Sequence, residues 1–281
     1  MNFLSFAQAN GLRIRDLIVG RIARCPTDDH PNTKNGAFFF EGDWGWVQNH
    51  ASHTEIQLWK SDKTMDVAVL DKRIAESKAA YAKQRDQAHK SAAIKADAIL
   101  SECTLLNHAY LANKGFSEEL GLVDSEGRLL IPMRDCLSDE LRGVQAIVWH
   151  TEERKFTKKM QHGMKAKGAV FRIGLKRATE TFLVEGYATA LSVHAALSQL
   201  HLSASVLCCF SDSNLVHVAN QISGKKFIFA DNDESKAGEH AAEKSCVPYV
   251  MSPELTFDAN DHHQKFGLLS LCKLVMELRK K

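Results

Sequence analysis

The feature of this sequence that most constrains its fold is a short apolar run that ends in an acidic residue and is followed by a turn and a helix. Phe182–Val184 is apolar, Glu185 follows it, and a glycine then turns the chain before apolar residues recur at helical spacing. The same order recurs at Phe227–Ala230, which ends in Asp231 and Asp233. Each motif is therefore expected to place carboxylates at the end of a buried strand.

A third apolar run, 205–210, lies between these two motifs and is followed by helical spacing over 215–222. The alternation of strand and helix predicts an α/β fold whose parallel sheet carries acids at the carboxyl ends of its strands. Residues two apart on an extended segment point to the same side, so Asp231 and Asp233 can enter one site. Hard oxygen ligands suit Mg²⁺ or Mn²⁺, which bind carboxylates together with substrate phosphates.

The order of these acidic residues also resembles a known domain. Glu185-Gly186, followed by Asp231-Asn232-Asp233, is similar to the pattern of the Toprim domain of primases, topoisomerases and some nucleases. The resemblance implies that Glu185, Asp231 and Asp233 are both catalytic residues and metal ligands. It implies Mg²⁺ or Mn²⁺ as the cofactor.

Composition narrows the class of protein. The chain has 281 residues, of which 44% are hydrophobic and 25% charged, which is typical of a globular protein. Its seven cysteines include no C-x-x-C pair, so neither a disulfide framework nor a cysteine-based zinc ribbon is indicated. No apolar run has the length of a membrane span or of a secretory h-region. We expect a cytoplasmic protein that does not enter a membrane.

The pattern of residues 1–64 predicts a small β-rich domain. Three strand-like runs, Ala37–Phe40, Trp46–Asn49 and Glu55–Lys60, are separated by polar turns. This region also holds Trp44, Trp46 and Trp59. Aromatic side chains on an open sheet can stack the bases of a single strand, but a hydrophobic core is the favoured interpretation.

The resemblance to primases implies that this region stands where bacterial replicative primases have a zinc ribbon. Within residues 25–48, whose pattern resembles the leading segment of plasmid- and phage-type primases, only Cys25 and His30 are Cys or His, which is too few for a four-ligand structural site. No zinc is therefore expected.

The composition of residues 65–122 predicts a helical connector. Val67–Cys103 is rich in Ala, Lys, Glu and Gln and contains neither Gly nor Pro, which indicates one long helix. A short helix over Asn107–Gly115 is expected to end at its glycine. His108 is expected to have a structural role.

Residues 123–281 are expected to form the catalytic core, with the Toprim-like domain over about 178–281. Along this core the sequence is similar to Toprim primases of plasmids and phages, a resemblance that covers roughly residues 20–270. The stretches that carry it are Leu130–Asp135, Gly143–Ile147, Lys155–Phe156, Gly168–Gly174 and Phe257–Asp261. The last stretch implies that Asp258 and Asp261 support the metal site.

A basic segment precedes the first acidic motif. Residues 154–177 contain nine Lys or Arg and no Asp or Glu, which favours contact with nucleic acid or nucleotide over an ordinary solvated loop. The residues expected to make that contact are Lys155, Lys158, Lys159, Lys165, Lys167 and Arg172.

Together these features predict a DNA primase that makes short RNA primers on single-stranded DNA from nucleoside triphosphates, for replication or transfer of a mobile element. The sequence has no G-x-x-x-x-G-K-[ST] motif, so a separate helicase or replication protein is the expected partner. Two alternatives remain: a Toprim-type metal-dependent nuclease and a non-catalytic adaptor that binds single-stranded nucleic acid.

Overall fold

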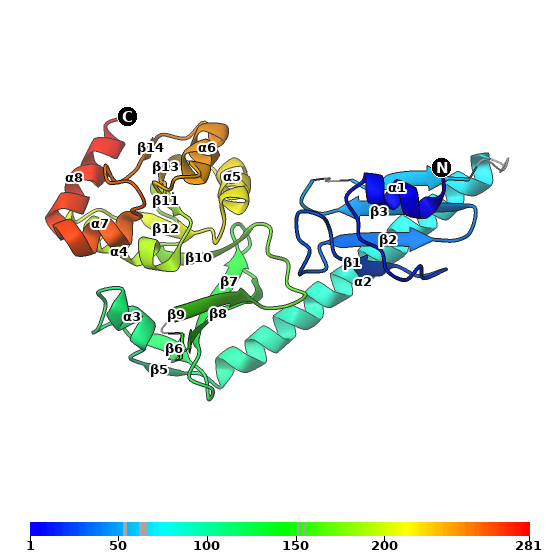
Figure 1. Cartoon of the computed structure of the whole chain (residues 1–281). Helices are drawn as coiled ribbons and strands as arrows, with labels where there is room; N and C mark the ends of the chain where they lie inside the picture. Colours follow the sequence, from blue (N-terminus) through cyan, green and yellow to red (C-terminus); the bar gives the residue numbers. More distant parts are fainter. Residues whose placement is uncertain (53–54, 62–66, 151, 154) are drawn as a thin grey trace. The chain divides into compact units, whose positions relative to one another are not determined.

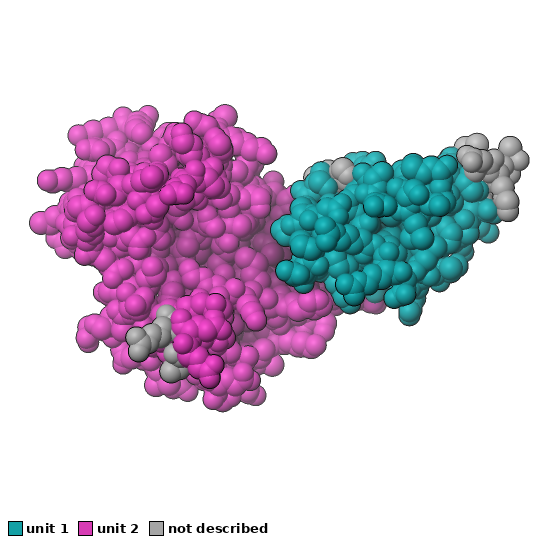
Figure 2. Space-filling view, viewed as in Figure 1, with its two compact units in different colours: residues 1–84 teal, residues 85–281 magenta. Residues whose placement is uncertain are grey.

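The computed structural model describes residues 1–52, 55–61, 67–150, 152–153 and 155–281, with the backbone alone for 67, 68 and 70 (Figure 1). The chain forms two compact units, Met1–Gln84 and Arg85–Lys281, which Figure 2 colours separately. The division falls inside helix α2 (Val67–Ser101). The sequence-based boundaries at residues 64 and 122 lie on either side of this helix.

Unit 1 contains a short helix, an antiparallel sheet and the first half of α2. Its other elements are α1 (Phe3–Ala9), β1 (Ala23–Cys25), β2 (Gly36–Phe40), β3 (Trp44–Asn49) and β4 (Gln57–Lys60). The strands pair in chain order and are antiparallel throughout. The small antiparallel sheet predicted for this region is confirmed, and β1 extends it at one edge.

Aromatic side chains fill both faces of this sheet. Trp59 packs on one face with Phe3 of α1, whereas Trp44 and Trp46 pack on the other face. These three tryptophans are at most 8% exposed, which confirms the core interpretation for them. The backbone of β3 passes very close to the Phe3 side chain of α1. A Cβ at Gly45 would lie only 2.7 Å from the Phe3 ring.

Helix α2 runs for 35 residues, close to the predicted range of 67–103. Its uninterrupted run of good helix formers accounts for that length. Its first part packs against the sheet of unit 1 through Ser77, whose Oγ accepts a hydrogen bond from Trp46 Nε1 at 2.9 Å. Its last part belongs to unit 2, where Ala92 O accepts a hydrogen bond from Gln161 Nε2 at 2.9 Å.

Unit 2 combines a large mixed sheet with helices on both of its faces (Figure 1). Its strands are β5 (Thr104–Leu106), β6 (Gly121–Val123), β7 (Leu129–Asp135), β8 (Leu141–His150), β9 (Lys155–Met160), β10 (Ala169–Gly174), β11 (Glu180–Val184), β12 (Ser205–Cys208), β13 (Lys225–Phe229) and β14 (Tyr249–Val250). Its remaining helices are α3 (Ala109–Asn113), α4 (Tyr187–Gln199), α5 (Asp212–Gln221), α6 (Ala237–Ser245), α7 (Ala259–Phe266) and α8 (Leu268–Arg279).

The sheet is mostly antiparallel and parallel in one part. Its main path runs β14-β13-β11-β12-β10-β7-β6-β5, and β8 pairs with β7 and β9. Only β12, β11, β13 and β14 are parallel among the described strands, and β10 is antiparallel to β12. The fold is therefore mixed α/β, and the predicted parallel sheet is one part of a larger sheet. The helical crossovers make it parallel, whereas turns join β7, β8 and β9 as antiparallel neighbours.

Strand β11 shows why the parallel part is buried on both faces. Phe182 and Val184 point into a core formed with α4 and α8, whereas Leu183 points into a second core formed with α5 and α6. Alternate residues of an extended strand project to opposite faces, so each face needs its own helical cover. This burial explains the continuous apolar runs in the sequence.

The short helix α3 confirms the structural role expected for His108. Its Nδ1 accepts the Tyr110 N–H at 3.1 Å and so caps the helix, while its Nε2 lies 3.1 Å from Gly127 O. The helix ends at Asn113 with Lys114 as its C-cap, and Gly115 follows with a φ of +84°, close to the predicted glycine stop.

No helix in the described part of the chain is long and apolar enough to cross a membrane.

Candidate functional site

The carboxyl ends of the parallel strands bring the sequence-predicted acids to one edge of the sheet. Val184 of β11 is in register with Cys208 of β12, and Leu183 is in register with Ile228 of β13. Glu185 therefore follows β11 at nearly the same level at which Asp231 follows β13. The loop after β12 enters the same edge between β10 and β11.

Glu185 is held between the end of β11 and the start of α4. Its backbone oxygen accepts the Phe210 N–H at 2.8 Å, which ties it to the chain after β12. Burial, which is the largest cause, and the neighbouring Asp212 and Asp233 together raise the pKa of its carboxyl to about 7. A pKa near 7 means that the protonated and ionised forms of this side chain are both populated at neutral pH.

Asp212 is a site residue that the sequence analysis missed. It is the first residue of α5, which Ser211 caps through a 3.3 Å hydrogen bond from Asn214 N–H to Ser211 Oγ. A hydrogen bond joins the carboxyls of Glu185 and Asp212 when the pair shares a proton. It raises the pKa of Glu185 and lowers that of Asp212, so Glu185 is the donor. Burial still leaves the pKa of Asp212 above its ordinary value. The signal that could have found it is its place directly after the strand predicted over 205–210.

The turn that carries Asp231 and Asp233 is fixed by Asn232 between them. Asn232 Nδ2 donates to Ser252 O at 3.0 Å and to Glu254 O at 3.1 Å, and its backbone is hydrogen-bonded to the same loop. Helix α6 approaches the turn closely, because a Cβ at Gly238 would lie 2.7 Å from Asp231 O.

Asp231 occupies the most unfavourable environment for a carboxylate in this group. Burial, which is the largest cause, and the charges of Asp258, Glu185, Asp212 and Asp233 together raise its pKa to about 8. Its Oδ1 is buried and has no hydrogen-bond partner in the described structure. A buried charge without a partner is costly, so the site has an unmet need for a positive ligand or a proton.

Asp258 joins the same group, and Asp261 orients it. Asp258 begins α7 in a capping box with Asp261, and its Oδ2 accepts the Thr189 hydroxyl of α4 at 3.0 Å. Asp261 also lies 3.7 Å from Lys114 Nζ. Of the two residues predicted to support the site, Asp258 affects the pKa of Asp231 directly, whereas Asp261 has capping and ion-pair contacts.

The donor chemistry of this acidic edge suits a hard divalent cation. We define the acidic edge as Glu185, Asp212, Asp231, Asp233 and Asp258, all of which offer carboxylate oxygens. The unpartnered Oδ1 of Asp231 is an available acceptor. Among the residues that the structure describes, no three His, Cys, Asp or Glu side chains are already close enough together to hold an ion.

Lys158 is a basic residue close enough to the acidic edge for its charge to act on Glu185. Its charge lowers the pKa of Glu185, and its Nζ lies 5.5 Å from the centre of the Tyr110 ring. Tyr110 is buried and packs against Tyr187 at the start of α4. Lys158 thus extends from β9 toward the end of β11.

The other predicted nucleic-acid contacts lie in different surroundings. Lys155 is ion-paired with Glu153, and Lys159 lies on the face of β9 opposite Lys158. Lys165 and Lys167 lie in the loop before β10, where both lower the pKa of His217.

Arg172 is held within the protein. Its guanidinium donates to Ser205 Oγ at 3.0 Å and to Cys136 O at 3.3 Å, and burial lowers its pKa. The six predicted contacts therefore do not form one continuous surface, and their role in nucleic-acid binding stays a prediction.

The two residues weighed as zinc ligands in unit 1 differ in exposure. Cys25 is buried, and burial raises the pKa of its thiol to about 11, whereas His30 is exposed.

A scan of the sequence against protein-family models finds no matching family.

Proposed function

We propose that this chain is a DNA primase that joins nucleotides on a single-stranded DNA template. The observation that carries the proposal is the acidic edge itself, in which burial and mutual repulsion raise the pKa of Asp231 to about 8 and that of Glu185 to about 7. Strained carboxyls at the carboxyl ends of parallel strands are more consistent with a ligand site than with a structural one. They also support the Toprim-like fold expected for residues 178–281.

The residues of the edge divide naturally into two roles. Asp231 and Asp233 would hold one or two Mg²⁺ or Mn²⁺ ions, with Asp258 beside them. A bound ion of this kind supplies charge stabilisation for the phosphates of the incoming nucleoside triphosphate. Lys158, whose charge already acts on Glu185, would contact a phosphate of the same substrate.

Glu185 has the properties of a general base in this reaction. With a pKa of about 7, Glu185 is partly ionised near neutral pH and can then take a proton, after which its hydrogen bond to Asp212 holds the protonated carboxyl in place. It would accept the proton of the primer 3′-hydroxyl as that oxygen bonds to the α-phosphorus and pyrophosphate leaves. Asp212 is a positioning residue in this account.

The proposal is tested by incubating the full chain with single-stranded DNA, four labelled ribonucleoside triphosphates and Mg²⁺ or Mn²⁺. The expected products are short labelled RNA chains complementary to the template. Shortened DNA without RNA synthesis would instead identify a nuclease, and unchanged DNA with binding alone would identify an adaptor.

A further inference from the structure

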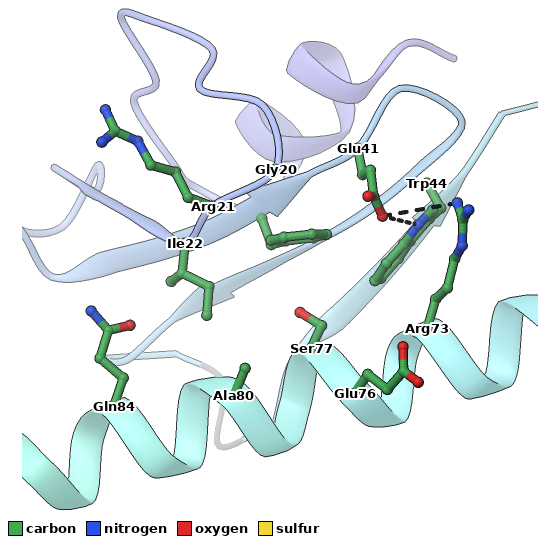
Figure 3. Close-up of a pocket in the computed structure, with 11 residues that line it drawn as sticks. Gly20, Arg21, Ile22, Glu41, Trp44, Arg73, Glu76, Ser77, Ala80 and Gln84 are labelled. Carbon is green, nitrogen blue, oxygen red and sulfur yellow. Dashed lines mark hydrogen bonds and ion pairs between the residues drawn. The ribbon is translucent and has the colours of Figure 1, made fainter.

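Unit 1 contains a cavity that the proposed function does not use. It has a volume of about 470 Å³ and lies between the sheet and the first half of α2 (Figure 3). Its lining includes Phe39 and Trp44 on the sheet side, Ser77 and Ala80 on the helix side, and charged residues at its rim. All of its lining residues belong to unit 1.

The sheet side of this groove is a fixed aromatic wall. The Phe39 ring is partly exposed and lies 5.1 Å from Trp44 and 6.4 Å from Trp46, nearly parallel to the latter. Both tryptophans are buried, and each indole N–H is hydrogen-bonded, to Glu41 Oε2 and Ser77 Oγ respectively. Phe39 thus offers a ring face whose support does not need to move when a ligand binds.

The helix side leaves room opposite that ring. Ser77 and Ala80 are one helical turn apart and project from α2 toward the sheet (Figure 3). Their side chains are among the smallest available, so the space between helix and sheet stays open there. An aromatic wall facing small side chains forms a slot suited to a flat ring.

Polar groups lie at the two ends of the slot. Arg21 and Gln84 lie toward one end, and Glu76 and Arg73 toward the other (Figure 3). Arg73 lies 3.9 Å from Glu41, whereas Arg21 and Glu76 have no ion-pair partner in the described part of the chain. An exposed guanidinium binds phosphate well, and a carboxylate accepts N–H groups such as an exocyclic amine.

We propose that this groove binds one nucleotide, with its base stacked on Phe39 and its phosphate bound by Arg21. Glu76 then accepts the exocyclic amine of the base, which favours adenine and cytosine over uracil. The same chemistry is offered by a free mononucleotide and by one nucleotide of a single strand. The site does not depend on the function proposed for unit 2.

The test uses the full chain in EDTA, so that the acidic edge is free of divalent metal. Calorimetric titrations with AMP, UMP, adenosine, ribose 5-phosphate and an oligo(dA) decamer separate the contributions of base and phosphate. Ala80→Leu fills the slot from an exposed position, and Ala79→Leu is its control on the neighbouring face of α2. Arg21→Ala removes the phosphate contact, with the exposed Arg15→Ala as its control.

We expect AMP binding to fall by about tenfold or more in Ala80→Leu, because the larger side chain fills the space for the base. We expect a fall of about tenfold in Arg21→Ala, because the charged hydrogen bond to the phosphate is lost. Both control variants should bind AMP like the parent, and AMP should bind better than UMP, adenosine or ribose 5-phosphate. If the decamer binds more tightly than AMP, and Ala80→Leu weakens both affinities equally, the natural ligand is a single strand. If AMP binds more tightly than the decamer, the natural ligand is the free nucleotide.

Three results would overturn this site. They are no binding of either AMP or the decamer at millimolar concentration, equal binding by Ala80→Leu and Ala79→Leu, and ribose 5-phosphate binding as well as AMP. None of these measurements involves nucleotide transfer, so failure here is distinct from failure of the primase proposal.

Discussion

The acidic edge of unit 2 and the aromatic sheet of unit 1 are both partly withdrawn from water, but with opposite consequences. Trp46 gains ring contacts and a hydrogen bond for its only polar group, so burial stabilises it. Asp231 gains carboxylate neighbours of its own charge and leaves one oxygen without a partner. A buried polar group that has its hydrogen-bond partner indicates a structural core. A buried carboxylate without a partner indicates a site for a ligand.

The largest effect is expected from neutralising the acidic edge. Asp231→Asn combined with Asp233→Asn should lower primer synthesis by about 1,000-fold or more, because a metal site contributes several kcal/mol to the transition state. The fold should persist, as measured by circular dichroism. Glu180→Gln is the matched control at the opposite end of β11, where Glu180 pairs with Arg279. Comparable primer synthesis by the double variant and the parent would show that the acidic edge is not required for activity.

Substitutions in the aromatic sheet of unit 1 should lower the stability of the protein and leave its primer synthesis unchanged. Trp46→Ala should reduce the free energy of unfolding of unit 1 by about 3–5 kcal/mol, the usual cost of emptying a buried aromatic position. Denaturant titration measures this loss, and Trp46→Phe should recover most of it. A Trp46→Ala protein with unchanged stability would show that these rings are not the core of unit 1.

The two regions should also differ in their dependence on pH. The pKa of Asp231 rises from 3.8 to about 8 on folding, so the stability it contributes is full below about pH 4 and is lost as pH rises toward 8. In EDTA the melting temperature should therefore fall by several degrees between pH 5 and pH 9. Asp231→Asn should flatten this slope, and added Mg²⁺ should stabilise the parent more at high pH. A slope that is identical in the parent and the variant would contradict the assigned environment of Asp231.

The smallest effect separates the two faces of β9. Lys158→Ala should reduce primer synthesis by about tenfold or less and lower the salt dependence of single-strand binding by about 0.7 in slope, the loss of one phosphate contact. Lys159→Ala, on the opposite face, should leave synthesis near the parent value. If Lys158→Ala and Lys159→Ala lose equal primer synthesis, only the total positive charge of β9 contributes, and the position of Lys158 has no special role.

Much of the parallel part of the sheet was predictable because its signals are local. Apolar runs ending at Glu185 and Asp231 define strands, and the helical spacing after each strand defines the crossovers that make neighbouring strands parallel. The same local logic predicted the long helix α2, whose composition contains no helix breaker.

The remaining features depend on contacts between distant residues. Asp212 enters the acidic edge only because β12 pairs beside β11. Arg172 belongs to a uniformly basic segment, yet its position on β10 directs it to Ser205 on a neighbouring strand. The antiparallel pairing of β10 with β12 likewise follows from the assembled sheet, which no single run of residues specifies.

The central claim, that the acidic edge is a divalent-cation site, is tested most directly by titrating Mn²⁺ into the metal-free full chain at pH 8 and following free ion by electron paramagnetic resonance. The account predicts one or two saturable sites per chain, lost in the Asp231→Asn and Asp233→Asn double variant and retained in Glu180→Gln. Mn²⁺ binding that is equal in the parent and the double variant, or absent from the parent, would contradict it.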